Sequence, residues 1–345
     1  MTNTLDREYI HSSPYLPDVA AEMTEAANTL ITNLTIDQKL LALYTEVHYE
    51  RLLWHYAPIK FRGLPLKNLD DKQKNLMFAL LSTGLSVVGT EIAKNITALE
   101  VVLKEIEADR NAVIFERDPD LYYLRIFGIP GSNSWSWSVN GHHLFCAFTI
   151  VDGGLIASTP NFMGSNPGII PDGYDGAGTG VLWNTDEMAR ELMSSFDNAQ
   201  RSKALVSELA PLDIYTLNSP LLLDGSGTTL PHDGIEVTNM NKSQKGLFLK
   251  LLNEYIQRLR PELSKPILDS FKDEGFERLK FAWAGGFSLN EGRYFRIQRT
   301  RPHSLLIEQD NVQNDANHIH SVIRDIDEDF GVDLLRMHYE QSHIH

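Results

Sequence analysis

Cysteine is almost absent from this 345-residue chain, which contains only Cys146. A single cysteine excludes any intrachain disulfide and fits a reducing compartment, although a cysteine-poor exported protein would have the same composition. Residues 1–20 also lack the basic start, the apolar run and the small-residue cleavage site of a secretory signal. We therefore expect a cytoplasmic protein.

Long hydrophobic runs are missing as well. The longest apolar segment, residues 76–88, is interrupted by Ser82, Thr83, Gly84 and Ser86. It is shorter than the roughly 20 residues that a bilayer-spanning helix needs. We expect no membrane span, and a buried helix explains this segment better.

Positive charge is in short supply, because 31 Lys and Arg stand against 46 Asp and Glu and the formal net charge is −15. Nonspecific binding to nucleic acid or to an anionic membrane needs a positive surface, so neither partner is expected. The proportions of hydrophobic residues (42%) and charged residues (22%) are ordinary for a soluble globular enzyme. We expect a small-molecule substrate, and a homodimer is an open alternative to a monomer.

Hydrophobic periodicity predicts helices in residues 1–110 and again in the middle of the chain, with strands in two clusters. Across 70–108 apolar residues recur every three or four positions, and Gly84 and Gly89 are candidate breaks. We recognise no internal repeat. The predicted class is α+β, with a mainly antiparallel sheet and flanking helices. Residues 1–110 are expected to pack as a helical part on an α+β catalytic domain at 111–345, or the two form one continuous domain.

Polar and apolar residues alternate between 317 and 325, which predicts a strand. Successive side chains of a strand point to opposite sides, so His318 and His320 share one face with Val322 and Arg324. Two histidines on one strand face are a candidate set of metal ligands.

A second pair, His142 and His143, is predicted to lie in another strand. Their side chains would point to opposite faces, so only one of them can join His318 and His320, and the sequence does not decide which. Neutral imidazole is a good ligand for zinc, iron or copper, and a catalytic metal keeps an open position for water or substrate. We therefore predict a divalent metal on these histidines. The alternative is that they donate hydrogen bonds to carbonyls inside a polar core.

Glu308 and Asp310 share one face of the preceding predicted strand and could serve as ligands, as histidine-orienting groups or as general bases. Arg324 could hold an anionic group of the substrate, or it could pair with Asp310, Asp325 or Asp329 and pin the C-terminal helix. Trp135 and Trp137 could wall the pocket or simply fill a core. The candidate residues of a substrate pocket are Trp135, Trp137, Asn311, Asn317 and His338.

Several motifs resemble one known family. They are GHHL at 141–144, LIEQDN at 306–311 and NHIHSVIRD at 317–325, with FAWAG at 281–285 and YFRIQ at 294–298. Together they resemble the family catalogued as domain of unknown function 3500. The resemblance covers most of the chain after about residue 121. It implies family membership but no reaction, because that label carries none.

From the residues themselves we predict a metal-dependent enzyme that hydrolyses or hydrates a small organic molecule through an activated water. Glu308 or Asp310 would act as the base, and Arg324 would steady the developing anion. An iron- or copper-dependent oxidoreductase is one alternative. A metal-free acid–base enzyme or a small-ligand-binding protein is another. Covalent catalysis by Cys146 is not favoured, because a buried strand cysteine is normally inert.

Overall fold

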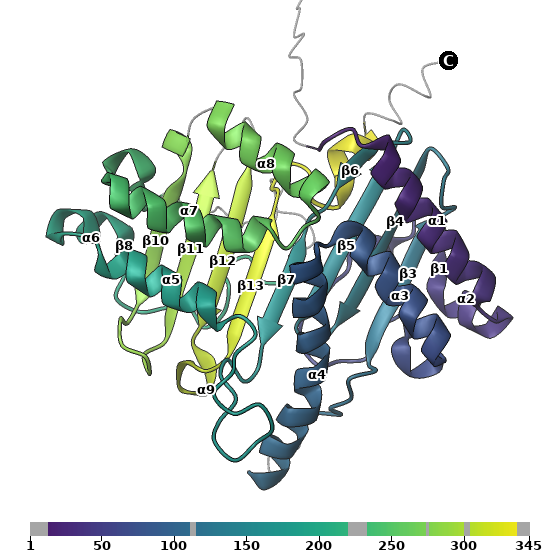
Figure 1. Ribbon diagram of the computed structural model, residues 1–345, viewed down its shortest axis with the longest axis horizontal. Helices are drawn as coiled ribbons and strands as arrows, with labels where there is room; N and C mark the ends of the chain where they lie inside the picture. Colours follow the sequence, from purple (N-terminus) through teal and green to yellow (C-terminus); the bar gives the residue numbers. More distant parts are fainter. Residues whose placement is uncertain (1–12, 111–114, 220–232, 274–275, 300–303, 337–345) are drawn as a thin grey trace, which may run out of the picture.

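One sheet runs across the whole molecule in the computed structural model, which describes residues 13–110, 115–219, 233–273, 276–299 and 304–336 (Figure 1). Within these residues it has 13 strands, in the order β1-β3-β4-β5-β7-β13-β12-β11-β10-β8, with β2 paired to β3, β6 to β5 and β9 to β10. The strands are β1 (Leu43–Tyr44), β2 (Leu64–Pro65), β3 (Tyr122–Gly128), β4 (Ser134–Gly141), β5 (Leu144–Val151), β6 (Leu155–Ala157), β7 (Asn161–Ser165), β8 (Leu205–Ser207), β9 (Ile235–Glu236), β10 (Lys280–Gly285), β11 (Arg293–Arg299), β12 (Leu305–Asn311) and β13 (Ile319–Arg324).

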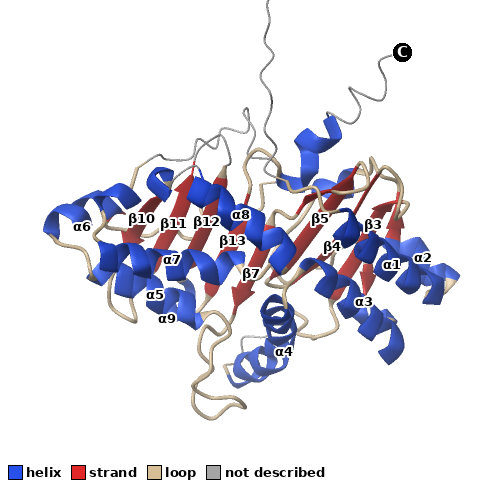
Figure 2. Ribbon diagram, turned by 45° about the horizontal axis from the view of Figure 1, so that its top comes forward, coloured by secondary structure: helices blue, strands red, loops and turns tan. Residues whose placement is uncertain are grey.

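The helices cover one face of this sheet (Figures 1 and 2). They are α1 (Pro17–Asn33), α2 (Ile36–Ala42), α3 (Asp71–Gly84), α4 (Val87–Asp109), α5 (Trp183–Ser194), α6 (Asn198–Ala204), α7 (Lys242–Ile256) and α8 (Pro261–Asp273), while the short α9 (Gln313–Ala316) lies in the turn between β12 and β13. Among the described helices, none is both long and apolar enough to cross a membrane. The mostly antiparallel sheet with segregated helices confirms the predicted α+β class. The first 110 residues, expected to be helical, also supply the edge strands β1 and β2.

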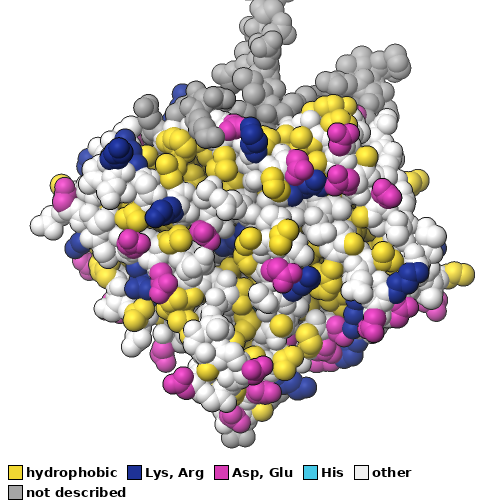
Figure 3. Space-filling model, in the orientation of Figure 1, with side chains coloured by type: hydrophobic (Ala, Val, Ile, Leu, Met, Phe, Trp, Pro, Cys, Tyr) yellow, Lys and Arg dark blue, Asp and Glu magenta, His cyan; other side chains and the backbone are white. Residues whose placement is uncertain are grey.

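Two hydrophobic cores lie between the helices and the sheet. One is shared by α1, α3 and α4 with β3, β4 and β5, and the other by α5 and α7 with β10, β11 and β12. On the opposite face a smaller cluster joins Trp54, Tyr56 and Ile214, which belong to loops, to Phe162 and Val322 of the central strands. The sheet is therefore buried on both faces at its centre. Charged side chains of both signs are scattered over the helix-covered face (Figure 3).

The long helical stretch predicted at 70–108 is broken at Gly84, one of the two expected positions. Asp70 caps α3 through the backbone N–H of Gln73, and Ser86 caps α4 through that of Gly89. A Cβ atom at position 84 would lie 2.3 Å from the ring of Phe148, so the end of α3 can approach the sheet only with glycine there. The break therefore serves packing as well as the change of direction between the two helices.

The chain contains two copies of one structural unit, a repeat that we did not recognise in the sequence. The first copy runs from α1 to β7 and the second from α5 to β13. In each copy one short strand pairs in parallel with the first long strand, as β1 does with β3 and β8 with β10. Another short strand pairs with it antiparallel, as β2 does with β3 and β9 with β10. The last strands of the two copies, β7 and β13, pair antiparallel in the middle of the sheet.

Four glutamines occupy equivalent places in the two copies. Residues 63–74 read GLPLKNLDDKQK and residues 234–245 read GIEVTNMNKSQK. In the first copy the Nε2 atom of Gln73 donates to the carbonyl oxygen of Asn33 at 2.7 Å, and in the second Gln244 donates to that of Ser195 at 2.8 Å. Each also bonds a partner glutamine, Gln38 at 2.9 Å and Gln200 at 2.8 Å. All four close capping boxes, at the starts of α2, α3, α6 and α7.

The two copies also meet at equivalent residues on the helix side. Leu85 and Leu259, each two residues before the next helix, form an antiparallel bridge. Ser86 N–H donates to the carbonyl of Arg258 at 2.9 Å, and Arg260 N–H donates to that of Gly84 at 3.1 Å. Such reciprocal bonds between matching segments are what an approximate two-fold relation requires.

Candidate metal centre

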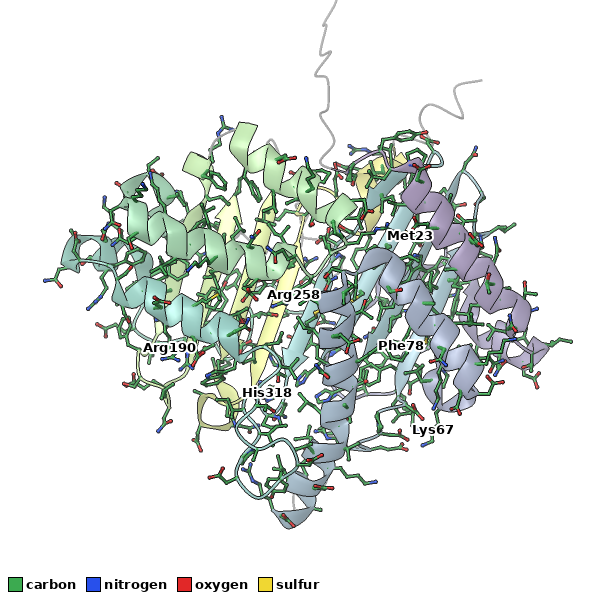
Figure 4. All side chains as sticks on the ribbon, in the orientation of Figure 1. Met23, Lys67, Phe78, Arg190, Arg258 and His318 are labelled. Atoms are coloured by element: carbon green, nitrogen blue, oxygen red, sulfur yellow. The ribbon has the colours of Figure 1, made fainter. Side chains whose placement is uncertain are left out.

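β13 directs the histidines of the predicted strand to the face opposite the helices. Ile319 and Ile323 lie in the two helix-side cores, whereas Val322 packs on the other face. His318 immediately precedes β13 and His320 lies within it, and both side chains are buried. Figure 4 shows His318 at the lower end of this strand. The alternation predicted from the sequence is therefore present.

The turn that leads into His318 is strained. Asn314, Asp315 and Ala316 adopt left-handed backbone conformations in succession, with φ of 53°, 55° and 59°. This conformation costs roughly 1–2 kcal/mol for a residue with a side chain, and such strain collects at functional sites. The Asn311 side chain accepts a hydrogen bond from the backbone N–H of His318 at 3.0 Å, which fixes the entry to β13.

Asn317 holds a neighbouring loop. Its Oδ1 accepts from the backbone N–H of Ile169 at 2.6 Å, and its Nδ2 donates to the carbonyl of the same residue at 3.0 Å. Asn311 and Asn317 were both predicted to line a substrate pocket. In the structure Asn311 bonds to the backbone of His318, and Asn317 bonds to the backbone of Ile169 in a neighbouring loop.

His142 and His143 form the two-residue turn between β4 and β5, and they do not belong to a strand as we expected. Their rings stack with centroids 3.8 Å apart. His143 has φ of 59°, and its carbonyl accepts from the N–H of Gly164 at 2.8 Å. A Cβ atom at position 164 would lie 2.9 Å from the His143 ring, so this glycine gives the imidazole its place beside β7.

His143, His318 and His320 form one cluster. A nitrogen of each ring lies within 4.8 Å of the others, and the Nε2 atoms of His143 and His318 are 2.9 Å apart. Two imidazole ligands of a tetrahedral zinc ion are roughly 3.3 Å apart, because Zn–N bonds are about 2.0–2.1 Å. The three ring pairs meet edge to face, with interplanar angles of 66°, 66° and 73°. The cluster therefore has the donor set of a three-histidine metal site, at nearly the required separation.

Burial sets the protonation of two of these rings. It lowers the pKa of His143 and of His318 well below the usual value, and the neighbouring histidines lower it further. Both imidazoles are therefore neutral near pH 7, which is the form that binds a metal ion.

The Nδ1 atom of His320 faces two carboxylates, Asp310 at 3.2 Å and Asp213 at 3.0 Å. Burial alone would lower the pKa of His320, but these carboxylates together raise it to about 9. Tyr56 hydrogen-bonds Asp213, whose side chain is 25% exposed, while Asp310 is fully buried. Because the carboxylates engage Nδ1, Nε2 is the nitrogen of His320 that remains for a metal. Such a carboxylate–histidine pair orients many metal-binding imidazoles.

His142 belongs to a separate buried network. Its Nδ1 atom contacts the Glu100 carboxylate of α4 and lies 3.2 Å from Nη1 of Arg117, which also binds Glu107 at 2.6 Å. His142 and Glu100 line a cavity of about 160 Å³ whose walls include Lys60. Of the two histidines predicted in this motif, only His143 joins the cluster, and His142 stacks behind it.

Glu308, a predicted base, holds the loop that carries Asp213. It accepts hydrogen bonds from the Tyr294 hydroxyl at 2.8 Å, from the backbone N–H of Tyr215 at 2.7 Å and from the Thr216 hydroxyl. Burial raises its pKa, and these donors oppose that shift. The carboxylate next to the histidines on β12 is therefore Asp310.

Arg324 makes the structural ion pair that was one of its two predicted roles. Its Nε atom donates to Asp329 at 2.6 Å, and Nη2 donates to the carbonyl of Ser219 at 2.9 Å. The bond to Asp329 pins the segment that follows β13, and the bond to Ser219 holds the end of loop 208–219.

Trp135 and Trp137 lie on the wrong face of the sheet to wall a pocket beside the histidines. Both are in the helix-side core, where Trp137 stacks on Phe148 at 4.6 Å. They alternate with serines along β4, and in this strand the aromatic face is the one turned toward the helices. His338, the remaining predicted pocket residue, lies outside the described residues.

Two residues of the site and one of the neighbouring His142 network were not found from the sequence. Tyr56 and Asp213 come from loops 53–63 and 208–219, and Glu100, which contacts His142, comes from α4. None stands at a motif spacing from a histidine. Glu100 gave the one signal that could have been used, because it lies among the apolar residues of α4 and a buried carboxylate needs a partner.

Comparisons with known proteins identify a family and nothing more specific. The family model described as "Protein of unknown function (DUF3500)" matches residues 17–332. No curated protein and no solved structure matches the chain.

Proposed function

We propose that this chain, which belongs to the DUF3500 family, is a metal-dependent enzyme that activates a water molecule for hydrolysis or hydration of a small organic molecule. The observation that carries the proposal is the convergence of His143, His318 and His320, one of which is oriented by Asp310. Three imidazole ligands suit zinc and leave a fourth position for water, and His320 would lose its Nε2 proton when the metal binds. A zinc-bound water has a pKa near 7 and is a nucleophile at neutral pH.

Asp213 is the favoured proton acceptor in this proposal. It stands at the same histidine as Asp310 but is 25% exposed, so it can pass a proton to solvent. Asp310 is fully buried and is better placed to orient His320. Glu308 and Arg324, which we first considered for the base and the anion-binding group, are engaged elsewhere and are left out of the reaction.

The test is elemental analysis of untagged protein purified without metal-affinity resin. His143→Ala and His318→Ala are expected to lose near-stoichiometric metal, because each removes one of three ligands. His142→Ala is the matched control, since this equally buried neighbour lies outside the cluster, and it should keep the metal. Asp310→Asn should weaken metal binding by about 10–100-fold in chelator competition, the usual effect of removing an orienting carboxylate.

The identity of the metal then selects the chemistry. Zinc supports water activation, whereas iron or copper would move the proposal to oxidation. Metal-free parent protein, or equal metal in parent and His318→Ala, would exclude the metal centre and leave acid–base chemistry or ligand binding.

A further inference from the structure

Arg258 is a buried cation that forms no close ion pair among the described residues, and the Glu254 carboxylate acts on it only from a greater distance. Arg258 follows α7 and is 2% exposed. Its Nη1 atom donates to the Ser321 hydroxyl at 3.1 Å, and its guanidinium lies 4.4 Å from the centre of the Tyr255 ring. Within the described part of the chain, Nε and Nη2 have no hydrogen-bond partner. Figure 4 shows Arg258 near the centre of the molecule, between the two groups of helices.

Four other buried arginines have a carboxylate in reach. They are Arg293 with Asp186 at 2.6 Å, Arg324 with Asp329 at 2.6 Å, Arg117 with Glu107 at 2.6 Å and Arg125 with Glu50 at 3.7 Å. A buried charge without compensation costs several kcal/mol. A counterion or ordered water that meets Nε and Nη2 would remove that cost.

A second buried group with unmet hydrogen bonds lies on the same face of the sheet as Arg258. Asn161 of β7 is 2% exposed, and apart from the thiol of Cys146 neither atom of its amide has a partner among the described residues. Cys146 lies in the helix-side core and interacts with both Arg258 and Asn161. Arg258 and Asn161 are therefore both linked to Cys146, on the opposite side of the sheet from the histidine cluster.

The donors in this region favour an anion over a neutral ligand. Arg258 offers two nitrogens, Nε and Nη2, that lack partners, together with a positive charge, and Asn161 can turn its amide N–H toward the same point. We propose that Arg258 and Asn161 form a buried binding site for a small monovalent anion, a halide or a carboxylate of the size of formate. The anion neutralises Arg258 of the second copy and contacts Asn161 of the first, so it ties the two copies together beside the Leu85–Leu259 bridge.

Bromide is the probe. Crystals of the intact protein grown in sodium bromide should show an anomalous peak at hydrogen-bond distance from the Arg258 guanidinium. In solution, replacing sodium gluconate by sodium bromide at constant ionic strength should raise Tm saturably by roughly 3–5 °C, the effect of a ligand near 100 times its Kd. Sodium formate should act in the same way if small carboxylates fit.

Arg258→Met should fold and lose the bromide response, because replacing a buried charge by an apolar side chain of similar length is often neutral or stabilising. Arg190→Met, at a half-buried arginine that pairs with Asp186, should keep the full response. If Arg258→Met fails to fold, Asn161→Ala must weaken the response instead. Water or an empty site at the guanidinium in the bromide crystals, or an unchanged response in Arg258→Met, would overturn the proposal. None of these results bears on the histidine cluster, so the two proposals stand or fall separately.

Discussion

At the scale of single residues, the chemistry of the candidate metal centre depends on the two nitrogens of His320. Nδ1 is engaged by Asp310 and Asp213, so a proton on this nitrogen is strongly favoured. The same carboxylates also favour a second proton on Nε2 when no metal is bound. A metal ion must displace that proton, and the site therefore couples metal binding to pH.

The stability of chelator-treated protein should fall as pH rises from 6.5 to 9. The pKa of His320 is raised from about 6.5 in the unfolded chain to about 9 in the fold, so its contribution is complete below 6.5 and lost as pH passes 9. The loss should be on the order of 2–3 kcal/mol in the free energy of unfolding. Burial raises the pKa of Asp310 to about 6, so its own effect has the same sign as that of His320 but falls at pH values below this window.

Urea unfolding at pH 6.5 and at pH 9 measures this change. His320→Gln is the control, and its stability should vary much less between the two pH values. The same decrease in His320→Gln and in the parent would show that another group titrates.

At the scale of elements, two glycines in helices differ in the space around the Cβ atom that each of them lacks. Gly84 ends α3 against the sheet, where a Cβ atom would meet the Phe148 ring at 2.3 Å. Gly246 lies inside α7, and nothing stands within 4 Å of the Cβ atom it lacks. The first position is closed to a methyl group by packing, and the second is open.

Gly84→Ala should lower the free energy of unfolding by about 1–3 kcal/mol, the usual cost of overpacking a core. Gly246→Ala should raise it by up to about 1 kcal/mol, because alanine is the better helix former. Both values come from urea denaturation of the purified variants. Equal effects of the two substitutions would mean that α3 does not approach β5 as closely as described.

At the scale of the whole molecule, the repeat explains why the centre of the sheet is also the centre of the chain. The two copies are joined by the β7–β13 ladder and by the Leu85–Leu259 bridge, and the connection between them passes through an exposed segment at 172–180. Only the second copy has histidines on its last strand, and the first copy contributes His143 from a hairpin turn. The candidate site is therefore built across the junction of two related units.

Cutting the chain in this connection should leave the two copies bound to each other. A site-specific protease sequence inserted after Gly173, where a Cβ atom would meet nothing within 4 Å, places the cut at a surface position. The cleaved protein should elute as one particle in size-exclusion chromatography and run as two bands on a denaturing gel. The uncleaved insertion variant is the control. Separation of the fragments under native conditions would show that the ladder and bridge do not hold the copies together.

Local sequence patterns were sufficient to predict much of the secondary structure of this protein. Helix periodicity indicated the regions of α1, α3, α4 and α7, and the alternation around His318 and His320 showed that the two histidines share one face. The same kind of pattern left the Trp135 strand undecided, because alternation says that two faces differ and not which one meets the helices. The repeat was missed because the equivalent segments 63–74 and 234–245 have the same order of apolar and polar residues but few identical residues.

The sequence by itself determined the α+β class, the family and the histidine pair of β13, because these depend on neighbours along the chain. Only the tertiary structure decided that His143 completes the cluster and that Asp310 and Asp213 hold His320. The physical reason is distance along the chain. Contacts between residues 143 and 318, or between 213 and 320, form when strands and loops from both copies meet, and no local spacing encodes that meeting.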